Sequence, residues 1–347
     1  MLVADWCRAK YRMYALPATP VKSAIQYHLR HFLGTMARIT TDLHLKLSES
    51  AVSNLQSKKI YTVFDLMSED SEKLMQYSGL SYQDILDLKN TVTKLYTGKI
   101  HKGPDLLKAS CNGVTKTGIQ SLDYLLRGGL YAGQIHEVCG VSSSGKSQLC
   151  HTVAVNVAQN SDGIVHYIDT NADFSATRAQ IILENKGCSE EMQVLVLERI
   201  SVTRVKTIQE VLSLLHSFQW TNTKLVIIDS LPALFFSFDP DLHRFTYTYS
   251  LNIFSNLIRW VAGEFNIPII TTNSVTYWQN YAEPDSSPLK RLSSVKPTLG
   301  TYWHSVPNSR LLLENTKSEG RKITVWKSSY LPSGSTCYIR ITNAGVV

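Results

Sequence analysis

The sequence predicts an α/β fold: a mostly parallel sheet with helices on both faces and an antiparallel edge, preceded by a small N-terminal helical domain. From about residue 111 onward, continuous apolar runs alternate with helical stretches, which is typical of a parallel sheet covered on both faces. Between Ser48 and Tyr96, apolar residues instead recur at the spacing of short amphipathic helices. A length of 347 residues suits one large and one small domain.

Residues 1–46 are expected to be a flexible basic extension. The first 41 residues hold six Lys or Arg and one Asp, and so supply most of the net charge of +7. Because the remainder is nearly neutral, any contact with nucleic acid must come from local loops. Three interpretations stay open for residues 1–35: a disordered arm, an extension ahead of a usual start at Met36, and a mitochondrial targeting segment, which would contain more serine.

The small helical domain is expected over residues 47–96. After the turn at Ser78 and Gly79, Ser81 and Asp84 form the S-x-x-D pattern of a capping box, which predicts the start of a helix. Residues 97–110 are expected to be a linker, because Gly98, Gly103 and Pro104 break any helix there.

Residues 111–347 are expected to form the α/β core. The predicted strands are residues 134–138, 164–168, 194–197, 225–228 and 268–271, with helices over 205–219 and 249–265. Three later runs, residues 310–313, 322–326 and 337–341, lack long helices between them and are expected to extend the sheet as its antiparallel edge.

Composition excludes several protein classes. With 44% hydrophobic and 18% charged residues, the chain can bury a core and is not disordered throughout. It contains no apolar run long enough to cross a bilayer, so no membrane association is expected. The six cysteines form no CxxC pair, which argues against a disulfide framework or a zinc site.

The strongest chemical signal is the G-x4-G-K-S motif that follows a predicted strand and opens a predicted helix. Its glycines allow backbone N–H groups to surround a polyphosphate, Lys146 reaches the outer phosphates, and the Ser147 hydroxyl ligates Mg²⁺. The sequence therefore predicts binding of ATP and Mg²⁺. The predicted nucleotide-binding residues are Gly140, Val141, Ser142, Ser143, Ser144, Gly145, Lys146, Ser147 and Gln148.

Asp229 is the predicted partner carboxylate of this site. It follows the apolar run Lys224 to Ile228, as expected of an acidic residue at the end of a buried strand. An apolar strand that ends in Asp is common on its own, but here it follows a complete P-loop. Asp229 is therefore expected to hold Mg²⁺ together with Ser147.

Several segments carry a family resemblance. The run Thr117 to Asp123 with Gly128, Gly129, Leu130 and Gly133, ahead of the P-loop, resembles the entry to a RecA-type ATPase core. With LVIIDS and Thr272–Asn273, the chain resembles the eukaryotic recombinases of that superfamily. The segments KPTLGTYW from Lys296, Lys327–Ser329 and Gly79–Ser81 are most similar to the D paralog group. The resemblance covers about Leu47 to Ile341.

The resemblance implies a RecA-type core that binds ATP between neighbouring subunits and has two loops facing DNA. It further implies a nuclear, heteromeric complex with other recombinase paralogs that assists homologous recombination repair of double-strand breaks and stalled forks. Relatives lay linker side chains against the neighbouring core, which points to Leu106 and Leu107 as apolar anchors. Lys327 is a further candidate for contact with a neighbour's phosphates, although a surface salt bridge explains it equally well.

Two departures from the family pattern bear on catalysis. Asn171 occupies the position of the glutamate that orients the attacking water in hydrolysing relatives, and an amide cannot act as a base. Asp173 is a nearby substitute. Ser274 stands where strand-exchange enzymes carry a phosphate-sensing glutamine. We therefore expect a weak, DNA-stimulated ATPase, with Lys146, Asp229 and Asn171 at the catalytic positions.

The segment between Ser274 and Tyr302 is the predicted DNA loop, because bases stack on aromatic rings while phosphates pair with Lys and Arg. The candidate DNA-binding residues are Tyr277, Trp278, Lys290, Arg291 and Lys296. A solvated surface loop is the alternative. The aromatic stretch from Phe235 to Tyr249 has nearly equal numbers of acidic and basic residues, so it is not expected to bind phosphates strongly. It is more typical of a protein–protein interface or of the hydrophobic core.

Three functional hypotheses remain at this point. The first is an ATP-binding accessory subunit that assembles with other paralogs and binds single-stranded or branched DNA. The second is an active DNA-dependent ATPase that forms homofilaments and exchanges strands, against which Asn171 and Ser274 argue. The third is an adaptor that does not need nucleotide, against which the complete P-loop argues.

Overall fold

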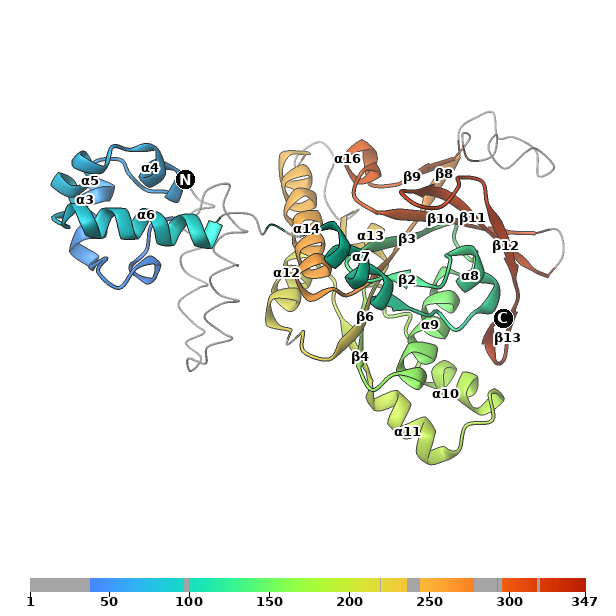
Figure 1. Cartoon of the computed structure of the whole chain (residues 1–347). Coiled ribbons are helices and arrows are strands. Elements are labelled where there is room, and N and C mark those ends of the chain that lie inside the picture. Colours follow the sequence, from blue (N-terminus) through green and yellow to red (C-terminus); the bar gives the residue numbers. More distant parts are fainter. Residues whose placement is uncertain are drawn as a thin grey trace. The chain divides into compact units, whose positions relative to one another are not determined.

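The structure, a computed structural model, describes residues 38–96, 100, 102–218, 220–235, 244–277, 292, 295–316 and 319–347 (Figure 1). The chain divides into two compact units, Met1–Ile100 and His101–Val347. Among the described residues, none of the helices is both long and apolar enough to cross a membrane.

The first unit is a small helical bundle. Ser48, Thr62 and Asp70 each precede a helix and accept a hydrogen bond from a backbone N–H of its first turn, which explains where these helices start. The unit contains the 3-10 helix η2 (Thr41–Leu43) and helices α3 (Glu49–Ser57), α4 (Val63–Ser68), α5 (Ser71–Ser78) and α6 (Tyr82–Tyr96).

The capping box predicted before α6 is confirmed. The backbone N–H of Asp84 donates to Ser81 Oγ at 3.2 Å, and the backbone N–H of Ser81 donates to Asp84 Oδ2 at 3.4 Å. Two unpaired donors at the helix start are thus satisfied reciprocally.

The helical unit begins earlier than the sequence suggested. Ile39 and Leu43, which we placed in a flexible extension ending at residue 46, are buried in the same apolar cluster as Leu47 and Leu55. The backbone N–H of Ile39 also donates to Tyr61 O at 2.9 Å. The basic residues nearby hid this short apolar segment, which has too few residues to show a helical period.

The expectation that residues 97–110 contain no helix was wrong over its second half, where α7 spans Gly103–Asn112. Pro104 lies in the first turn of α7. A proline is tolerated at this place because the first backbone N–H groups of a helix have no intrahelical acceptor to lose.

The second unit is built on a sheet with the strand order β12-β11-β10-β3-β7-β6-β4-β5 within the described residues. The strands from β10 to β5 run parallel, whereas β11 and β12 pair antiparallel at one edge. The predicted fold class is therefore confirmed. The bounds are β3 Ile135–Cys139, β4 Ile164–Asp169, β5 Ile200–Arg204, β6 Thr223–Asp229, β7 Ile269–Asn273, β10 Ser309–Asn315, β11 Arg321–Ser328 and β12 Thr336–Ile339.

Helices cover both faces of this sheet (Figure 1). Helix α9 packs against β4 and β6, whereas α14 contacts β3 and packs with α12. The described helices of this unit are α7, α8 (Gln120–Leu125), α9 (Lys146–Asn160), α10 (Ala176–Asn185), α11 (Glu190–Glu198), α12 (Ile208–Ser217), α13 (Leu231–Phe235), α14 (Arg244–Phe265) and α16 (Gly300–His304). The described residues also form three two-stranded ribbons: β1 (Val114–Thr115) with β2 (Leu130–Tyr131), β8 (Val275–Tyr277) with β9 (Val295–Pro297), and β13 (Ile341–Thr342) with β14 (Gly345–Val346).

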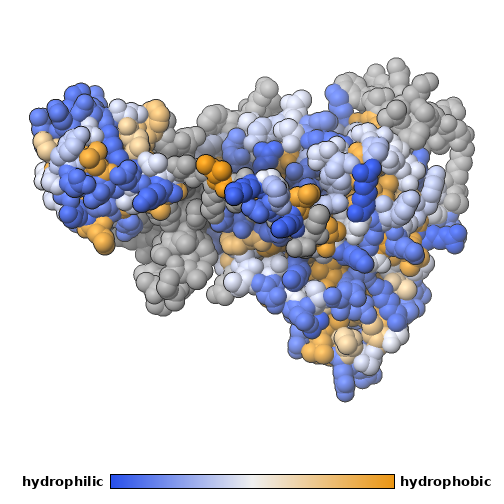
Figure 2. Space-filling model, viewed as in Figure 1, coloured by the Kyte–Doolittle hydropathy of each residue, from blue (hydrophilic) through white to orange (hydrophobic). Residues whose placement is uncertain are grey.

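One predicted strand is a helix. Residues 194–197 lie in α11, and β5 follows it at Ile200–Arg204. Ser189 caps α11 by accepting from Met192 N, and two glutamates occupy its first turn, where they suit the helix dipole. Val196 is buried, whereas Met192, Val194 and Leu195 are exposed, and apolar side chains gather over α11 in Figure 2.

Candidate nucleotide site

The P-loop connects the end of β3 to the start of α9, at the carboxyl edge of the sheet. Gly145 precedes α9 with φ +106°, a left-handed conformation that favours glycine. A Cβ at Gly140 would lie 2.5 Å from Ser144 Oγ and 2.6 Å from Leu313 O. The loop therefore requires both glycines, and it presents backbone N–H groups at a helix N-terminus, which is a ready anion site.

Lys146 folds back over this loop. Its Nζ donates to Gly140 O at 2.9 Å and to Val141 O at 2.8 Å. Burial lowers the pKa of Lys146, and the nearby Asp229 carboxylate opposes that shift. Ser144 Oγ is buried and has no hydrogen-bond partner within the described part of the chain. The cradle of glycines, the lysine and the unpartnered buried hydroxyl fit a bound polyphosphate.

Asp229 ends β6 and is almost fully buried. Tyr167 Oη donates to its Oδ2 at 2.8 Å, and Thr272 Oγ1 donates to its Oδ1 at 2.5 Å. Burial and the Asp229 charge raise the pKa of Tyr167, so this tyrosine remains a donor. Two hydroxyls thus orient Asp229, but in the described residues no Lys or Arg forms an ion pair with it.

The Asp229 carboxylate and the Ser147 hydroxyl suit Mg²⁺, which commonly uses one or two protein oxygens together with substrate phosphates and water. The described residues contain no group of three His, Cys, Asp or Glu that could hold a metal by themselves. Mg²⁺ would thus need the phosphates of a nucleotide as further ligands, which fits a P-loop site.

Asn171 lies in the loop that follows β4. Its Nδ2 is 3.4 Å from Ser230 Oγ, and its side chain is exposed. The buried Asp169 shapes this loop by accepting from the backbone N–H groups of Asn171, Asp173 and Phe174 at 3.0–3.3 Å. The loop therefore brings the Asn171 amide beside the end of β6, next to Asp229.

A buried charge network on the other side of the P-loop was missed by sequence reasoning. Glu137 and Arg310 are both fully buried and form a salt bridge between β3 and β10. Trp303 Nε1 donates to Glu137 Oε1 at 2.6 Å, and Asn273 Nδ2 donates to the same oxygen at 2.8 Å. Since these residues lie far apart in the sequence, no local pattern indicated the network.

Asn273 extends this network to the predicted DNA segment. Its Oδ1 accepts from the backbone N–H of Ser274 at 2.8 Å and from Thr298 Oγ1, and its Nδ2 donates to Thr298 O at 3.2 Å. Both ends of residues 274–298 are thus fixed at one point beside β3.

The predicted DNA-binding residues lie largely outside the described residues. This applies to Trp278, Lys290 and Arg291 and to the side chain of Tyr277, although Tyr277 itself ends β8. Lys296 lies in β9, and its side chain is exposed.

Comparison with known proteins agrees with this geometry. The sequence profile of the Rad51 family matches residues 113–347, which include the P-loop and Asp229. The chain belongs to the Rad51 family. A second profile, described as the RAD51D N-terminal domain, matches residues 36–94, and its start before Ile39 agrees with the buried residues there.

Individual relatives cover most of the chain. DNA repair protein RAD51 homolog 4 from Bos taurus is 33% identical over 306 residues, which are 83% of this chain and 90% of that protein. DNA repair protein RAD51 homolog 2 from Mus musculus is 29% identical over 315 residues, 81% of this chain and 90% of that protein. A crystal structure of the RadB recombinase aligns with a TM-score of 0.53 and 25% identity, covering 67% of this chain and 97% of that one. The expected similarity to the D paralog group is confirmed.

Proposed function

We propose that this Rad51-family chain is an ATP-binding recombinase paralog that acts as an accessory subunit in homologous recombination repair of double-strand breaks and stalled forks. Its site of action would be the nucleus, in a heteromeric complex with other paralogs. Support comes from the similarity to proteins named DNA repair protein RAD51 homolog 4 and RAD51 homolog 2.

The observation that carries the proposal is the pairing of the P-loop with Asp229. Lys146 is held over the loop by two carbonyl oxygens, which a bound phosphate can replace as partners of Nζ. The Asp229 carboxylate forms no ion pair with a described Lys or Arg, and it is oriented by Tyr167 and Thr272. When bound, Mg²⁺–ATP supplies a γ-phosphoryl group that can be transferred to water.

Slow turnover follows from Asn171. An amide side chain can donate to and orient a water molecule, but it cannot take the proton from it. Asp173, the alternative base, is exposed, and its backbone N–H is bound to Asp169. We therefore propose that bound ATP serves assembly more than motion, with Lys146 and Asp229 binding Mg²⁺–ATP and Asn171 positioning water.

Contacts with DNA and with other paralogs belong to the same proposal. Tyr277, Trp278, Lys290, Arg291 and Lys296 would contact single-stranded or branched DNA. The base of their segment is fixed to Asn273, close to the P-loop strand. Leu106 and Leu107 are exposed on α7 and suit an apolar contact with a neighbouring paralog.

The test is ATP affinity and steady-state hydrolysis of the full chain, with and without single-stranded DNA. Lys146→Ala should lose at least about tenfold in ATP affinity, because the charge that reaches the outer phosphates is removed. Asn171→Glu should raise the hydrolysis rate. Lys94→Ala, at an exposed site on α6, is the control and should match the parent.

Each rival predicts a different result. Robust DNA-stimulated hydrolysis by the parent, unchanged in Asn171→Glu, would favour the strand-exchange motor. Undetectable ATP binding by the parent would favour the nucleotide-independent adaptor. For DNA, Lys290→Ala with Arg291→Ala should lower single-strand affinity and flatten its salt dependence.

A further inference from the structure

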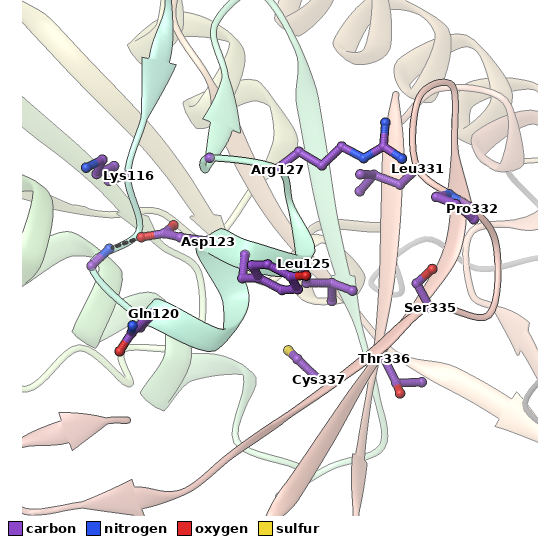
Figure 3. A pocket seen from close by; sticks show the side chains of 13 residues that line it. Lys116, Gln120, Asp123, Leu125, Arg127, Leu331, Pro332, Ser335, Thr336 and Cys337 are labelled. Atoms are coloured by element: carbon purple, nitrogen blue, oxygen red, sulfur yellow. Dashed lines mark hydrogen bonds between the residues drawn. The ribbon is translucent and has the colours of Figure 1, made fainter.

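We propose that the groove between α8 and β12 binds an extended acidic segment of a partner protein, which adds as a strand to the open edge of β12. This α8–β12 groove has a volume of about 860 Å³. Its lining includes Lys116, Tyr124, Arg127, Leu331, Pro332 and Cys337 (Figure 3). The proposal does not depend on bound nucleotide.

The first observation is the open edge of the sheet. In the described part of the chain, β12 pairs only with β11 and ends the strand order. An unpaired edge presents backbone N–H and C=O groups that another extended chain can pair with. When such an edge borders a groove, alternate side chains of the added strand can enter that groove.

The second observation is the charge at the rim. Lys116 and Arg127 are exposed, and neither forms an ion pair with another described residue. Asp123 is the acidic residue of the lining, and it faces inward, accepting from Thr117 N, Thr117 Oγ1 and Gly118 N at 2.7–3.1 Å. The outward charge of the α8–β12 groove is thus positive, which favours an acidic ligand.

The third observation is the placement of the two cations. Lys116 precedes α8 and Arg127 follows it, so they flank a helix of six residues, about 9 Å long (Figure 3). A strand advances about 3.3 Å per residue and its side chains alternate between two faces, so acidic residues four positions apart lie on one face and can reach both cations. The turn that contains Arg127 allows little variation in sequence, because a Cβ added at Gly129, two residues further on, would lie 2.4 Å from Thr115 O.

The fourth observation is the apolar lining between the cations. Leu125, Leu331 and Cys337 line the groove, and Tyr124 is 89% exposed at its border. Burial raises the pKa of Cys337 to about 11, so this thiol remains uncharged and acts as part of the apolar surface. An acidic segment with acids at positions i and i+4 and an apolar residue at i+2, all on one face of the strand, would match this lining.

The test uses the full chain and a fluorescein-labelled peptide that repeats Asp-Thr-Val-Thr, which places Asp and Val on the same face of a strand. Binding is measured by fluorescence anisotropy. The peptide should bind the parent, and Lys116→Glu with Arg127→Glu should weaken binding at least about tenfold. The control is Lys94→Glu with Lys108→Glu, which makes the same charge change at exposed positions outside the groove and should bind like the parent.

Two further probes separate strand addition from simple charge attraction. The same peptide with alternate backbone nitrogens methylated keeps its charge but loses the donors of a strand, and it should bind at least about tenfold more weakly. A peptide that repeats Lys-Thr-Val-Thr should not bind. The proposal would be overturned if the methylated peptide bound as well as the unmethylated one, or if both double variants lost the same amount of binding affinity. It would also be overturned if the parent did not bind the peptide, or if a single-stranded oligonucleotide displaced it.

Discussion

Two buried carboxylates at the centre of the sheet have opposite surroundings. Glu137 on β3 meets the Arg310 guanidinium, the Trp303 ring N–H and the Asn273 amide, so its charge is neutralised within the protein. The Asp229 carboxylate, at the end of β6, accepts hydrogen bonds from two hydroxyls and forms no ion pair in the described structure. A buried charge is costly unless it is paired.

This difference distinguishes an acid with a structural role from one that we propose to bind Mg²⁺. Glu137 holds strands together, and no ligand is needed to explain its burial. Asp229 lies near Lys146 but forms no ion pair with it in the described structure, as expected of a group that we propose to bind Mg²⁺ when nucleotide is present.

The largest expected effect is that of Arg310→Met. It leaves Glu137 as an unpaired buried charge, which should lower the free energy of unfolding by about 3–5 kcal/mol. Urea unfolding followed by tryptophan fluorescence measures this, because Trp303 contacts Glu137. The double variant Glu137→Gln with Arg310→Met should recover much of the loss. A loss below about 1 kcal/mol in the single variant would contradict the structural role.

The second effect concerns His136, the neighbour of Glu137 on β3. Burial lowers the pKa of His136 to about 4, from an ordinary value of 6.5. Between these two values the unfolded chain binds a proton that the folded chain does not, so stability falls as pH drops from 6.5 to 4. The loss is roughly 3 kcal/mol. His136→Asn should flatten this part of the pH profile of unfolding.

A smaller effect is expected from Tyr167→Phe. It removes one of the two hydrogen bonds that orient Asp229, worth about 1.5–3 kcal/mol for a charged acceptor in this buried setting. We expect a lower free energy of unfolding and a several-fold loss of Mg²⁺-dependent ATP affinity, measured by calorimetry. Tyr338→Phe, at an exposed site on β12, is the matched control. Unchanged ATP affinity would show that Asp229 is oriented by other groups.

The smallest change in stability is expected from Asp229→Asn without nucleotide, because removal of an unpaired buried charge offsets part of the disturbed hydrogen bonding. The free energy of unfolding should stay within about 1 kcal/mol of the parent. The Mg²⁺ dependence of ATP binding should be lost all the same. A destabilisation as large as that of Arg310→Met would indicate that Asp229, like Glu137, has a structural role.

The sequence predicted the features whose signals are local. The placement of the P-loop between a strand and a helix, and of Asp229 at the end of a strand, could be predicted because glycine spacing and an apolar run that ends in Asp are readable within a few residues. The mostly parallel sheet followed from the alternation of apolar runs with helices, and its antiparallel edge from the lack of long helices between the last three runs. The order of the strands was not predicted.

Features that depend on contacts between distant residues, or on the residues at the ends of helices, could not be predicted. Glu137 and Arg310 look like ordinary charged residues in strands until the sheet brings them together. The helix over Gly103–Asn112 was missed because Pro104 was weighed as a helix breaker rather than as a first-turn residue. Residues 194–197 show a β-branched pattern that the cap at Ser189 overrides.

Helix α9 is enclosed almost throughout, since its residues from Leu149 to Ala158 are all buried. Amide hydrogens in such a helix exchange with solvent only when the whole core opens. Hydrogen exchange along Leu149–Ala158 should therefore report the global stability of the core. Any extra protection confined to Lys146–Gln148 would report nucleotide bound at the P-loop. Hydrogen exchange in this one helix would therefore measure both core stability and nucleotide binding.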